Sequence, residues 1–234
     1  MMVSAMQLIE QSSFGVRSAV LTMTSPEGGP RFVLLPMIHL GTRRFYGAVV
    51  DELGKCDLVL MEGVQGRRTR LVTLAYRIAG RIHRQGLIDQ SRGMNLTTLR
   101  SRLVTPDATA AEFATSWRQV SLRMRWIVYV LAPVLGIWLA IVGPRRALGQ
   151  DVAVDDLPSR DDALAPDQIQ ALQSAITDDR DLLLCEALWA AAESELGVKA
   201  VAVCWGAGHM PAAVRFLRGQ LGYRITHATW IEVF

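Results

Sequence analysis

Three side chains with the chemistry of a hydrolytic site stand at the ends of apolar runs in this sequence. His39 ends the run "FVLLPMIH", Glu62 follows "DLVLM", and His209 follows "VKAVAVCWGAG". Two imidazoles and a carboxylate form the ligand set of several hydrolytic metal sites that keep one position open for water. These residue types therefore predict that a divalent ion, manganese, cobalt or zinc, activates a water for attack on a small-molecule or peptide substrate.

The same residues also allow chemistry without a metal. A histidine near a bound water can act as a general base, so metal-free hydrolysis is a second hypothesis. A third hypothesis is that the chain is not an enzyme, and that its histidines bind haem or a peptide in a binding or signalling module.

A shared site requires that the three apolar runs lie side by side as strands. Ligands of open α/β sheets bind at the carboxyl ends of the strands, where these three residues would meet. We therefore predict that His39, Glu62 and His209 point into one cleft, within reach of a single metal ion. The glycines Gly206 and Gly208 allow a tight turn just before His209.

The first third of the chain has the pattern of a β-β-α-β unit. Residues 16–41 contain two apolar runs joined by a Pro-Glu-Gly-Gly-Pro turn, and residues 42–56 have the periodicity of a helix. The short continuous apolar run at 57–63 is typical of a parallel strand buried on both faces. The two early strand ends would thus be carried by one compact unit.

The middle of the chain has a helical pattern. Residues 66–85 have an apolar stripe and an arginine face, and residues 95–126 continue with helical character that is broken at Pro106. Asp107 or Thr109 is the expected N-cap of the helix that follows this proline.

An apolar segment at 126–143, with arginines on both sides, is long enough to cross a bilayer. A single crossing would place His39 and Glu62 on one side and His209 on the other, which would divide the sheet. We therefore predict that the segment is helical and does not separate the two halves of the chain. Two alternatives remain: a buried helix pair within the insert, or an exposed apolar feature that forms a peripheral membrane contact or a homo-oligomer interface. The exposed feature is the expected one, because a domain of 234 residues has limited room to bury so long a run.

The last third returns to the α/β pattern. The expected elements are a strand at 149–158, a helix at 165–197, a strand at 198–206, a helix at 209–222 and a closing strand at 223–234. The predicted fold is one α/β domain over 1–234, with a central mixed, mostly parallel sheet flanked by helices. A helical apolar insert at roughly 95–148 interrupts it.

Composition narrows the class of protein. The chain has 234 residues, of which half are hydrophobic, and a net charge of +3. Its arginines do not alternate with aromatic residues, so nucleic acid is not an expected partner. Three cysteines without metal-type spacing, and an N-terminus without a secretory pattern, favour reduced thiols and a cytoplasmic, or membrane-associated, location.

Four short motifs, in a fixed order, resemble those of the TraB/GumN/Tiki family, and more distantly those of haem-binding ChaN proteins and erythromycin esterases. They are "LLPMIHLG", "LVLMEG", "DDRD" at 178–181 and "WGAGHM" followed by "LGY". The resemblance covers most of the chain outside the apolar segment. The resemblance rests on the order of the motifs in the chain more than on any one of them.

The resemblance implies a metal-dependent peptidase or amidase, because two Gly-x-x-His motifs are linked to that activity in the Tiki branch. Residues 206–209 keep this pattern, whereas Pro36 replaces the glycine that would precede His39. Arg180 is a surface arginine paired with Asp179 or Asp181, or a functional residue that holds a substrate carboxylate or a developing oxyanion; its family position favours the second role. Asp181 is a candidate to orient Arg180 or a histidine.

Overall fold

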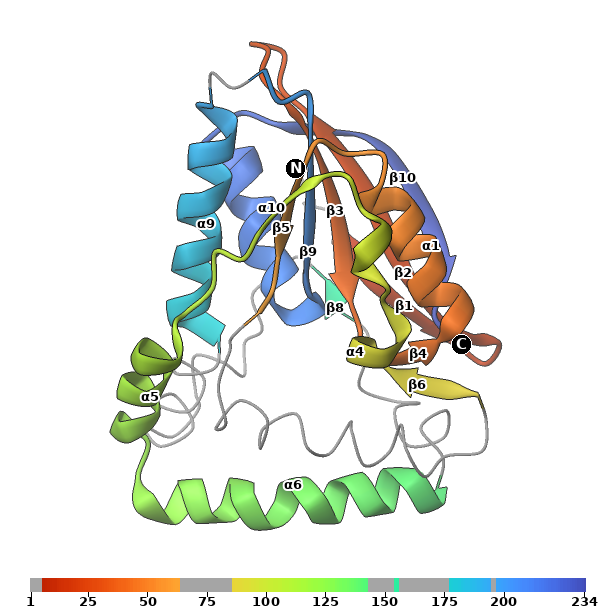
Figure 1. The fold of residues 1–234 in the computed structure, drawn as a ribbon, viewed down its shortest axis with the longest axis vertical. Helices are drawn as coiled ribbons and strands as arrows, with labels where there is room; N and C mark the ends of the chain where they lie inside the picture. Colours follow the sequence, from red (N-terminus) through yellow and green to blue (C-terminus); the bar gives the residue numbers. More distant parts are fainter. Residues whose placement is uncertain (1–5, 64–85, 143–153, 156–176, 195–196) are drawn as a thin grey trace.

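A mixed β-sheet forms the centre of the computed structural model, which describes all residues except 1–5, 64–85, 143–153, 156–176 and 195–196 (Figure 1). Its strands lie in the order β7-β5-β9-β3-β2-β1-β8, and β10 pairs with β2. Pairing is parallel from β7 through β5 and β9 to β3, and antiparallel elsewhere. The predicted α/β class, with a mixed, mostly parallel sheet flanked by helices, is confirmed.

The strands have the following bounds: β1 Gln7–Ser12, β2 Gly15–Thr24, β3 Arg31–Met37, β5 Leu58–Met61, β7 Arg102–Val104, β8 Val154–Asp155, β9 Ala200–Gly206 and β10 Arg224–Glu232. A separate pair, β4 Leu40–Thr42 and β6 Leu87–Asp89, is antiparallel. The helices are α1 Arg43–Leu53, α4 Gln90–Gly93, α5 Ala110–Gln119, α6 Leu122–Val142, α9 Asp179–Ala192 and α10 Met210–Gly219, with single 3-10 turns η1 Leu96–Thr98 and η4 Ala207–His209.

Alternate residues of the central strands bury the two faces of the sheet against different helices. On one face, β3, β5 and β9 residues such as Leu35, Val59 and Ala202 pack with α1. On the other face, residues such as Leu34 and Val203 pack with α9 and α10. Figure 1 shows α1 on one side of the sheet and α9 and α10 on the other. These two layers hold the carboxyl ends of the parallel strands at one edge.

One sequence expectation is wrong. The helical pattern predicted from residue 95 onwards gives way to the single turn η1 and then to the strand β7, which pairs with Leu58–Leu60 of β5. The run is short, and pairing with an exposed strand edge outweighs a weak local preference for helix. Thr109 caps α5 with a capping box that includes Glu112, as predicted, whereas Asp107 has a different role.

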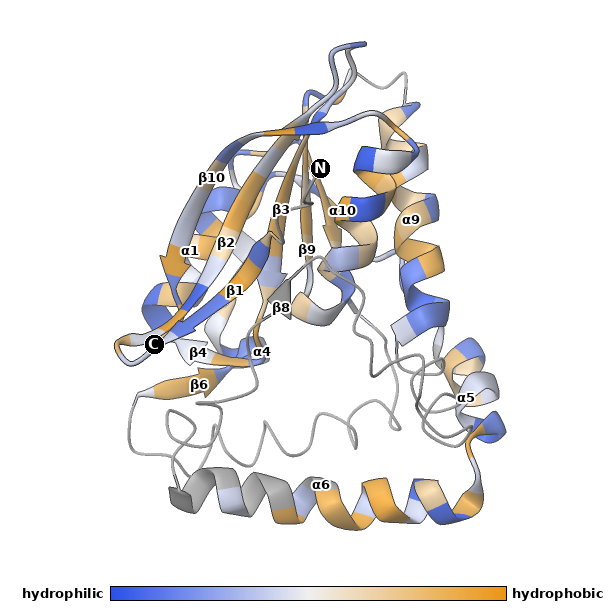
Figure 2. Cartoon of the chain, turned by 180° about the vertical axis from the view of Figure 1, so that it is seen from behind, coloured by the Kyte–Doolittle hydropathy of each residue, from blue (hydrophilic) through white to orange (hydrophobic). Residues whose placement is uncertain are grey.

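Residues 122–142 form the long helix α6, and the apolar segment is helical where it is described. α6 runs along one end of the molecule, beyond α5 (Figures 1 and 2). Trp117 of α5 is buried and donates from Nε1 to the Tyr129 hydroxyl of α6 at 2.9 Å, so the start of α6 is packed on α5. Among the described residues, no helix is long and apolar enough to cross a membrane.

Two further expectations concern segments outside the described residues. The helix predicted at 66–85 lies wholly in an undescribed range, as do 143–148 of the insert and the first part of the helix predicted at 165–197. The limits of the insert therefore stay a prediction, while the strand at 154–155 and the helices α9 and α10 agree with the sequence pattern.

A small platform beneath His39 links the sheet to the β4–β6 pair. The Tyr46 hydroxyl donates to the backbone carbonyl oxygen of Ile38 at 2.9 Å. The backbone N–H of Gln90 donates to the backbone carbonyl oxygen of His39 at 3.0 Å. Gly93 lies against the ring of Tyr46, and a methyl group there would overlap that ring. The position of His39 therefore depends on a glycine 54 residues further along the chain.

We expect Gly93→Ala to lower the free energy of unfolding by about 1–3 kcal/mol, because the added methyl group overpacks a buried ring. Gly47→Ala is the matched control, since Gly47 lies on the exposed side of α1, where an added methyl group would have no described atom within 4 Å. It should raise stability by about 0.5–1 kcal/mol through helix propensity. Equilibrium urea unfolding measures both, and equal midpoints for Gly93→Ala and the parent chain would contradict the platform.

Candidate functional site

Three strand ends and one helix start supply the polar side chains of the site. Glu62 directly follows β5, and its amide donates to the carbonyl oxygen of Cys204 at 3.0 Å, which continues the parallel pairing of β5 with β9. His209 ends the η4 turn after β9. Arg180 lies in the first turn of α9, which packs beside α10. The fold therefore brings residues far apart in sequence to one edge of the sheet.

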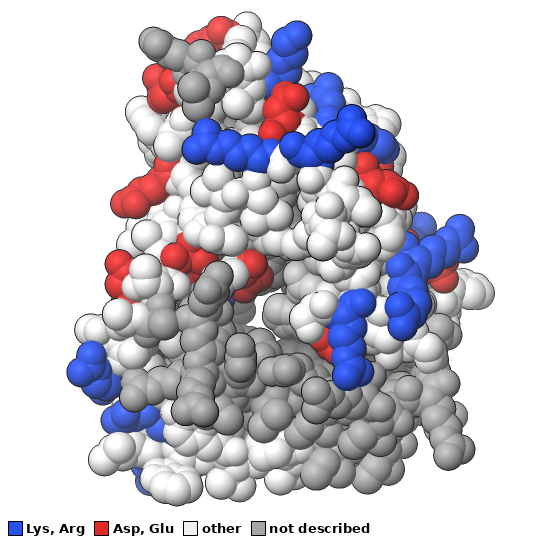
Figure 3. All heavy atoms as spheres, in the orientation of Figure 1, with Lys and Arg blue, Asp and Glu red and all other residues white. Residues whose placement is uncertain are grey.

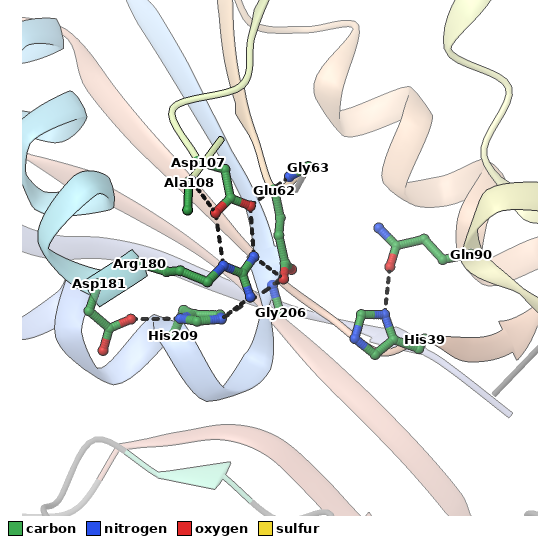
Figure 4. Close-up of polar contacts among 10 residues, drawn as sticks. All are labelled: His39, Glu62, Gly63, Gln90, Asp107, Ala108, Arg180, Asp181, Gly206 and His209. Atoms are coloured by element: carbon green, nitrogen blue, oxygen red, sulfur yellow. Dashed lines mark hydrogen bonds and ion pairs between the residues drawn. The ribbon is translucent and has the colours of Figure 1, made fainter. Parts of the chain in front are cut away.

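Arg180 is the centre of this cluster (Figure 4). Its guanidinium donates from Nη2 to Oε1 of Glu62 at 2.5 Å, and it binds both carboxylate oxygens of Asp107, from Nε at 2.8 Å and from Nη2 at 2.7 Å. Arg180 is only 8% exposed. The guanidinium also lies 5.4 Å from the centre of the Trp205 ring. One buried cation is thus shared by two carboxylates and faces an aromatic ring.

Backbone amides fix the two carboxylates. Gly206 donates to Oε2 of Glu62 at 2.7 Å, Gly63 donates to Oδ2 of Asp107 at 2.9 Å, and Ala108 donates to Oδ1 of Asp107 at 2.8 Å. A methyl group at Gly206 would lie only 3.0 Å from Oε2 of Glu62, so the close approach favours glycine there. The acceptors that hold Arg180 are therefore themselves oriented by the strand ends.

The charges of this cluster stabilise one another. Burial alone would raise the pKa of Glu62, but Arg180, His39 and His209 together outweigh it and hold that pKa below its ordinary value of 4.5. Burial would likewise lower the pKa of Arg180, but Asp107 and Glu62 raise it instead. Glu62 is therefore a carboxylate, and Arg180 a cation, at neutral pH.

His209 is held at both ring nitrogens. Its Nδ1 lies 2.6 Å from Oδ1 of Asp181, and its Nε2 lies 3.2 Å from Nη1 of Arg180. Since a guanidinium only donates, Nε2 accepts and Nδ1 carries the proton that is donated to Asp181. Asp181 orients the histidine, one of the two roles considered for it from the sequence. His209 in turn holds Arg180.

His39 is placed differently. It lies on the other side of Glu62 from Arg180 and His209 (Figure 4), and its Nδ1 is 3.1 Å from Oε1 of Gln90. The amide oxygen of Gln90 can only accept, so Nδ1 carries the proton and Nε2 is the basic nitrogen. His39 is half-buried, whereas His209 is buried.

The predicted residues thus gather at one edge of the sheet, but not as three ligands around one point. Nε2 of His209 lies 3.9 Å from Oε1 of Glu62, and the guanidinium of Arg180 binds both groups. Among the described residues, no three His, Cys, Asp or Glu side chains are grouped to hold a metal ion. In this arrangement, the guanidinium of Arg180 lies between Glu62 and His209 and brings positive charge to both.

The sequence pattern missed two residues of the site. Asp107 was expected only as a helix cap, yet it is the second carboxylate on Arg180. Gln90, which binds His39, was not a candidate. Asp107 comes three residues after β7 and is therefore a fourth residue near a parallel strand end, a signal that depends on recognising β7 as a strand.

A cavity of about 430 Å³ lies beside Arg180, between α5 and α9. Its lining is mainly apolar, with Ala108, Ala111, Phe113 and Leu183, and also includes Glu112, Thr115, Ser116 and Asp179. The cavity offers room for a small apolar group next to the charged cluster.

The chain matches no family model, no curated protein and no solved structure.

We expect Arg180→Met to lower the free energy of unfolding at neutral pH by about 3–5 kcal/mol, because it leaves buried carboxylates without their cation. The control is Arg17→Met, which removes an ion pair between Arg17 and Glu10 at 2.7 Å. The side chain of Arg17 is 49% exposed. That surface pair should contribute no more than about 1 kcal/mol. Urea unfolding of the two variants gives the comparison.

The same variant should reverse the pH dependence of stability. Because the folded pKa of Glu62 is lowered, its contribution is complete above the ordinary value of 4.5 and is lost as the pH falls through the folded value. Without Arg180, burial dominates and raises that pKa, so protonation stabilises the fold instead. The gap between parent and variant should therefore narrow as the pH falls from 7 to about 4. A constant gap would show that Arg180 does not control Glu62.

Proposed function

We propose that the chain is a metal-independent hydrolase of esters or amides, in which His39 is the general base. The observation that supports this choice is the hydrogen bond between His39 and Gln90, which sets the tautomer of His39. Both nitrogens of His209 are engaged, by Asp181 and by Arg180, which makes it a positioning residue for Arg180. His39 has its proton fixed on Nδ1 by Gln90, so Nε2 is the nitrogen whose tautomeric state lets it accept a proton.

In the proposed reaction, Nε2 of His39 removes a proton from a water molecule, and the water oxygen attacks the carbonyl carbon of the substrate. The carbonyl oxygen gains negative charge, which the buried Arg180 cation, on the other side of Glu62, stabilises through its electric field rather than by a direct contact. The tetrahedral intermediate then expels the alcohol or amine, which takes its proton from His39. Glu62 keeps Arg180 in place through the hydrogen bond to its Nη2.

The metal-dependent peptidase or amidase that the family resemblance implies is the alternative. It would require Arg180 to leave Glu62 and His209 before both could bind an ion, because their donor atoms are engaged by Arg180, Gly206 and Asp181. This cost, and the cation already present, favour the metal-free reaction. A small-molecule ester or amide with an apolar group suits the cavity beside Arg180.

We expect His39→Ala to lower kcat/KM for p-nitrophenyl esters by about 10²- to 10⁴-fold, the usual effect of removing a general base. Circular dichroism and urea unfolding should show a folded variant, since His39 is only half-buried. His227→Ala is the matched control, because His227 is exposed on β10, and it should leave the rate unchanged. Equal rates for His39→Ala and the parent chain would exclude His39 as the base.

A chelator should leave the ester hydrolysis unchanged. Elemental analysis of untagged protein, incubated with manganese, cobalt or zinc and then desalted, should find far less than one ion per chain in both the parent and His209→Ala. One ion per chain in the parent that is lost in His209→Ala, together with inhibition by the chelator, would favour the metal-dependent alternative over the proposal.

A further inference from the structure

One long face of α6 exposes apolar side chains to solvent. The exposed residues, with their exposed fractions, are Leu122 68%, Trp126 68%, Ile127 39%, Val130 55%, Leu131 56%, Val134 55% and Trp138 47%. We refer to these seven residues as the α6 face. Such a continuous apolar surface marks an interaction site in most proteins. Figure 2 shows the hydrophobic character continuing along the coloured length of α6.

The α6 face covers about half of the helix circumference. Five of its residues recur at every fourth position, from Leu122 to Trp138, and at about 100° per residue this row drifts slowly around the helix. Ile127 and Leu131 fill the space beside the row. The other side of the helix contacts α5, where Met124, Val128 and Tyr129 pack against the cluster around Trp117. The face is thus presented outward by a helix that is fixed at its start.

The described charged residues within α6 are all arginines. Arg123 is exposed and lies on the same side of the helix as Trp126, Ile127 and Val130, with which it lines a shallow surface pocket. The sequence from Phe113 to Gln150 contains no aspartate or glutamate. On the face drawn in Figure 3, the described atoms at the end of the molecule where α6 lies are white or blue.

We propose that the α6 face binds the surface of a membrane that contains anionic lipids. Its apolar residues would enter the boundary between headgroups and acyl chains, with the helix lying in the membrane plane, and Arg123 would bind lipid phosphate. Trp126 and Trp138, about 18 Å apart along the helix, suit this boundary because indole has an apolar body and a polar N–H. α6 lies along one end of the molecule (Figure 1), where a flat surface can reach it.

A second copy of the chain fits this face less well. Pairing two α6 faces would bring Arg123 into an apolar interface, and residues 113–150 of the partner would offer no acidic side chain to neutralise it. A lipid headgroup supplies that negative charge. The proposal does not depend on the hydrolase chemistry, because the α6 face contains none of the residues placed in the site.

The test is flotation of the full chain with phosphatidylcholine vesicles, prepared with and without phosphatidylserine. We expect the chain to float with the anionic vesicles and to be released by high salt. Trp126→Glu should reduce the bound fraction at least tenfold, and Arg123→Gln should weaken binding about fivefold. The matched control is Trp189→Glu on α9, whose tryptophan is 50% exposed but lies outside the α6 face, and it should bind like the parent.

Circular dichroism on the variants checks that each one is folded, and analytical ultracentrifugation checks the oligomeric state. Absence of flotation with either vesicle, or equal flotation with both, would overturn the proposal. A dimer in solution that Trp126→Glu dissociates would identify a second copy as the occupant of the α6 face and would overturn it too.

Discussion

The neutralisation of one buried guanidinium is the constraint on which the site depends. Arg180 is withdrawn from water, and a cation can be buried only if its charge and its N–H groups are matched by nearby acceptors. Glu62, Asp107 and His209 provide these acceptors, and each of them comes from a different part of the chain. Backbone amides at the strand ends and Asp181 on α9 then hold the acceptors in turn.

The need to neutralise Arg180 explains why the site lies at the edge of the sheet where the parallel strands end. Parallel strands end together, so β5 and β9 place Glu62 and His209 beside each other, and the segment after β7 brings Asp107 to the same edge. The short strand β7 adds little apolar burial, since Leu103 is exposed. Its structural value is that it directs Asp107 towards Arg180. If residues 102–104 formed a helix, as the local pattern favoured, the chain would not run parallel to β5. The Asp107 carboxylate would then not reach Arg180.

Most of the fold and most of the side chains of the site could be predicted from the sequence, for different reasons. The continuous apolar runs of β3, β5 and β9 record burial directly, so these strands and the residues at their ends could be found. Asp107 and Gln90 follow elements of only three residues, β7 and β6, whose existence depends on partners distant in sequence. The binding of Arg180 to Glu62 and His209 could not be predicted from spacing either, because the partners of a strand-end residue depend on the tertiary fold.

The last strand has a consequence for the order of folding. β10 pairs along nearly the whole of β2, and Val233 accepts from the amide and the hydroxyl of Thr42, 191 residues earlier in the chain. Thr42 is also the N-cap of α1, the helix that supports the platform of His39. Closing so large a loop carries a high entropic cost and favours slow folding. During synthesis the early strands must therefore wait, unpaired along one edge, until the final strand has left the ribosome, and in that interval they are open to chaperones and to aggregation.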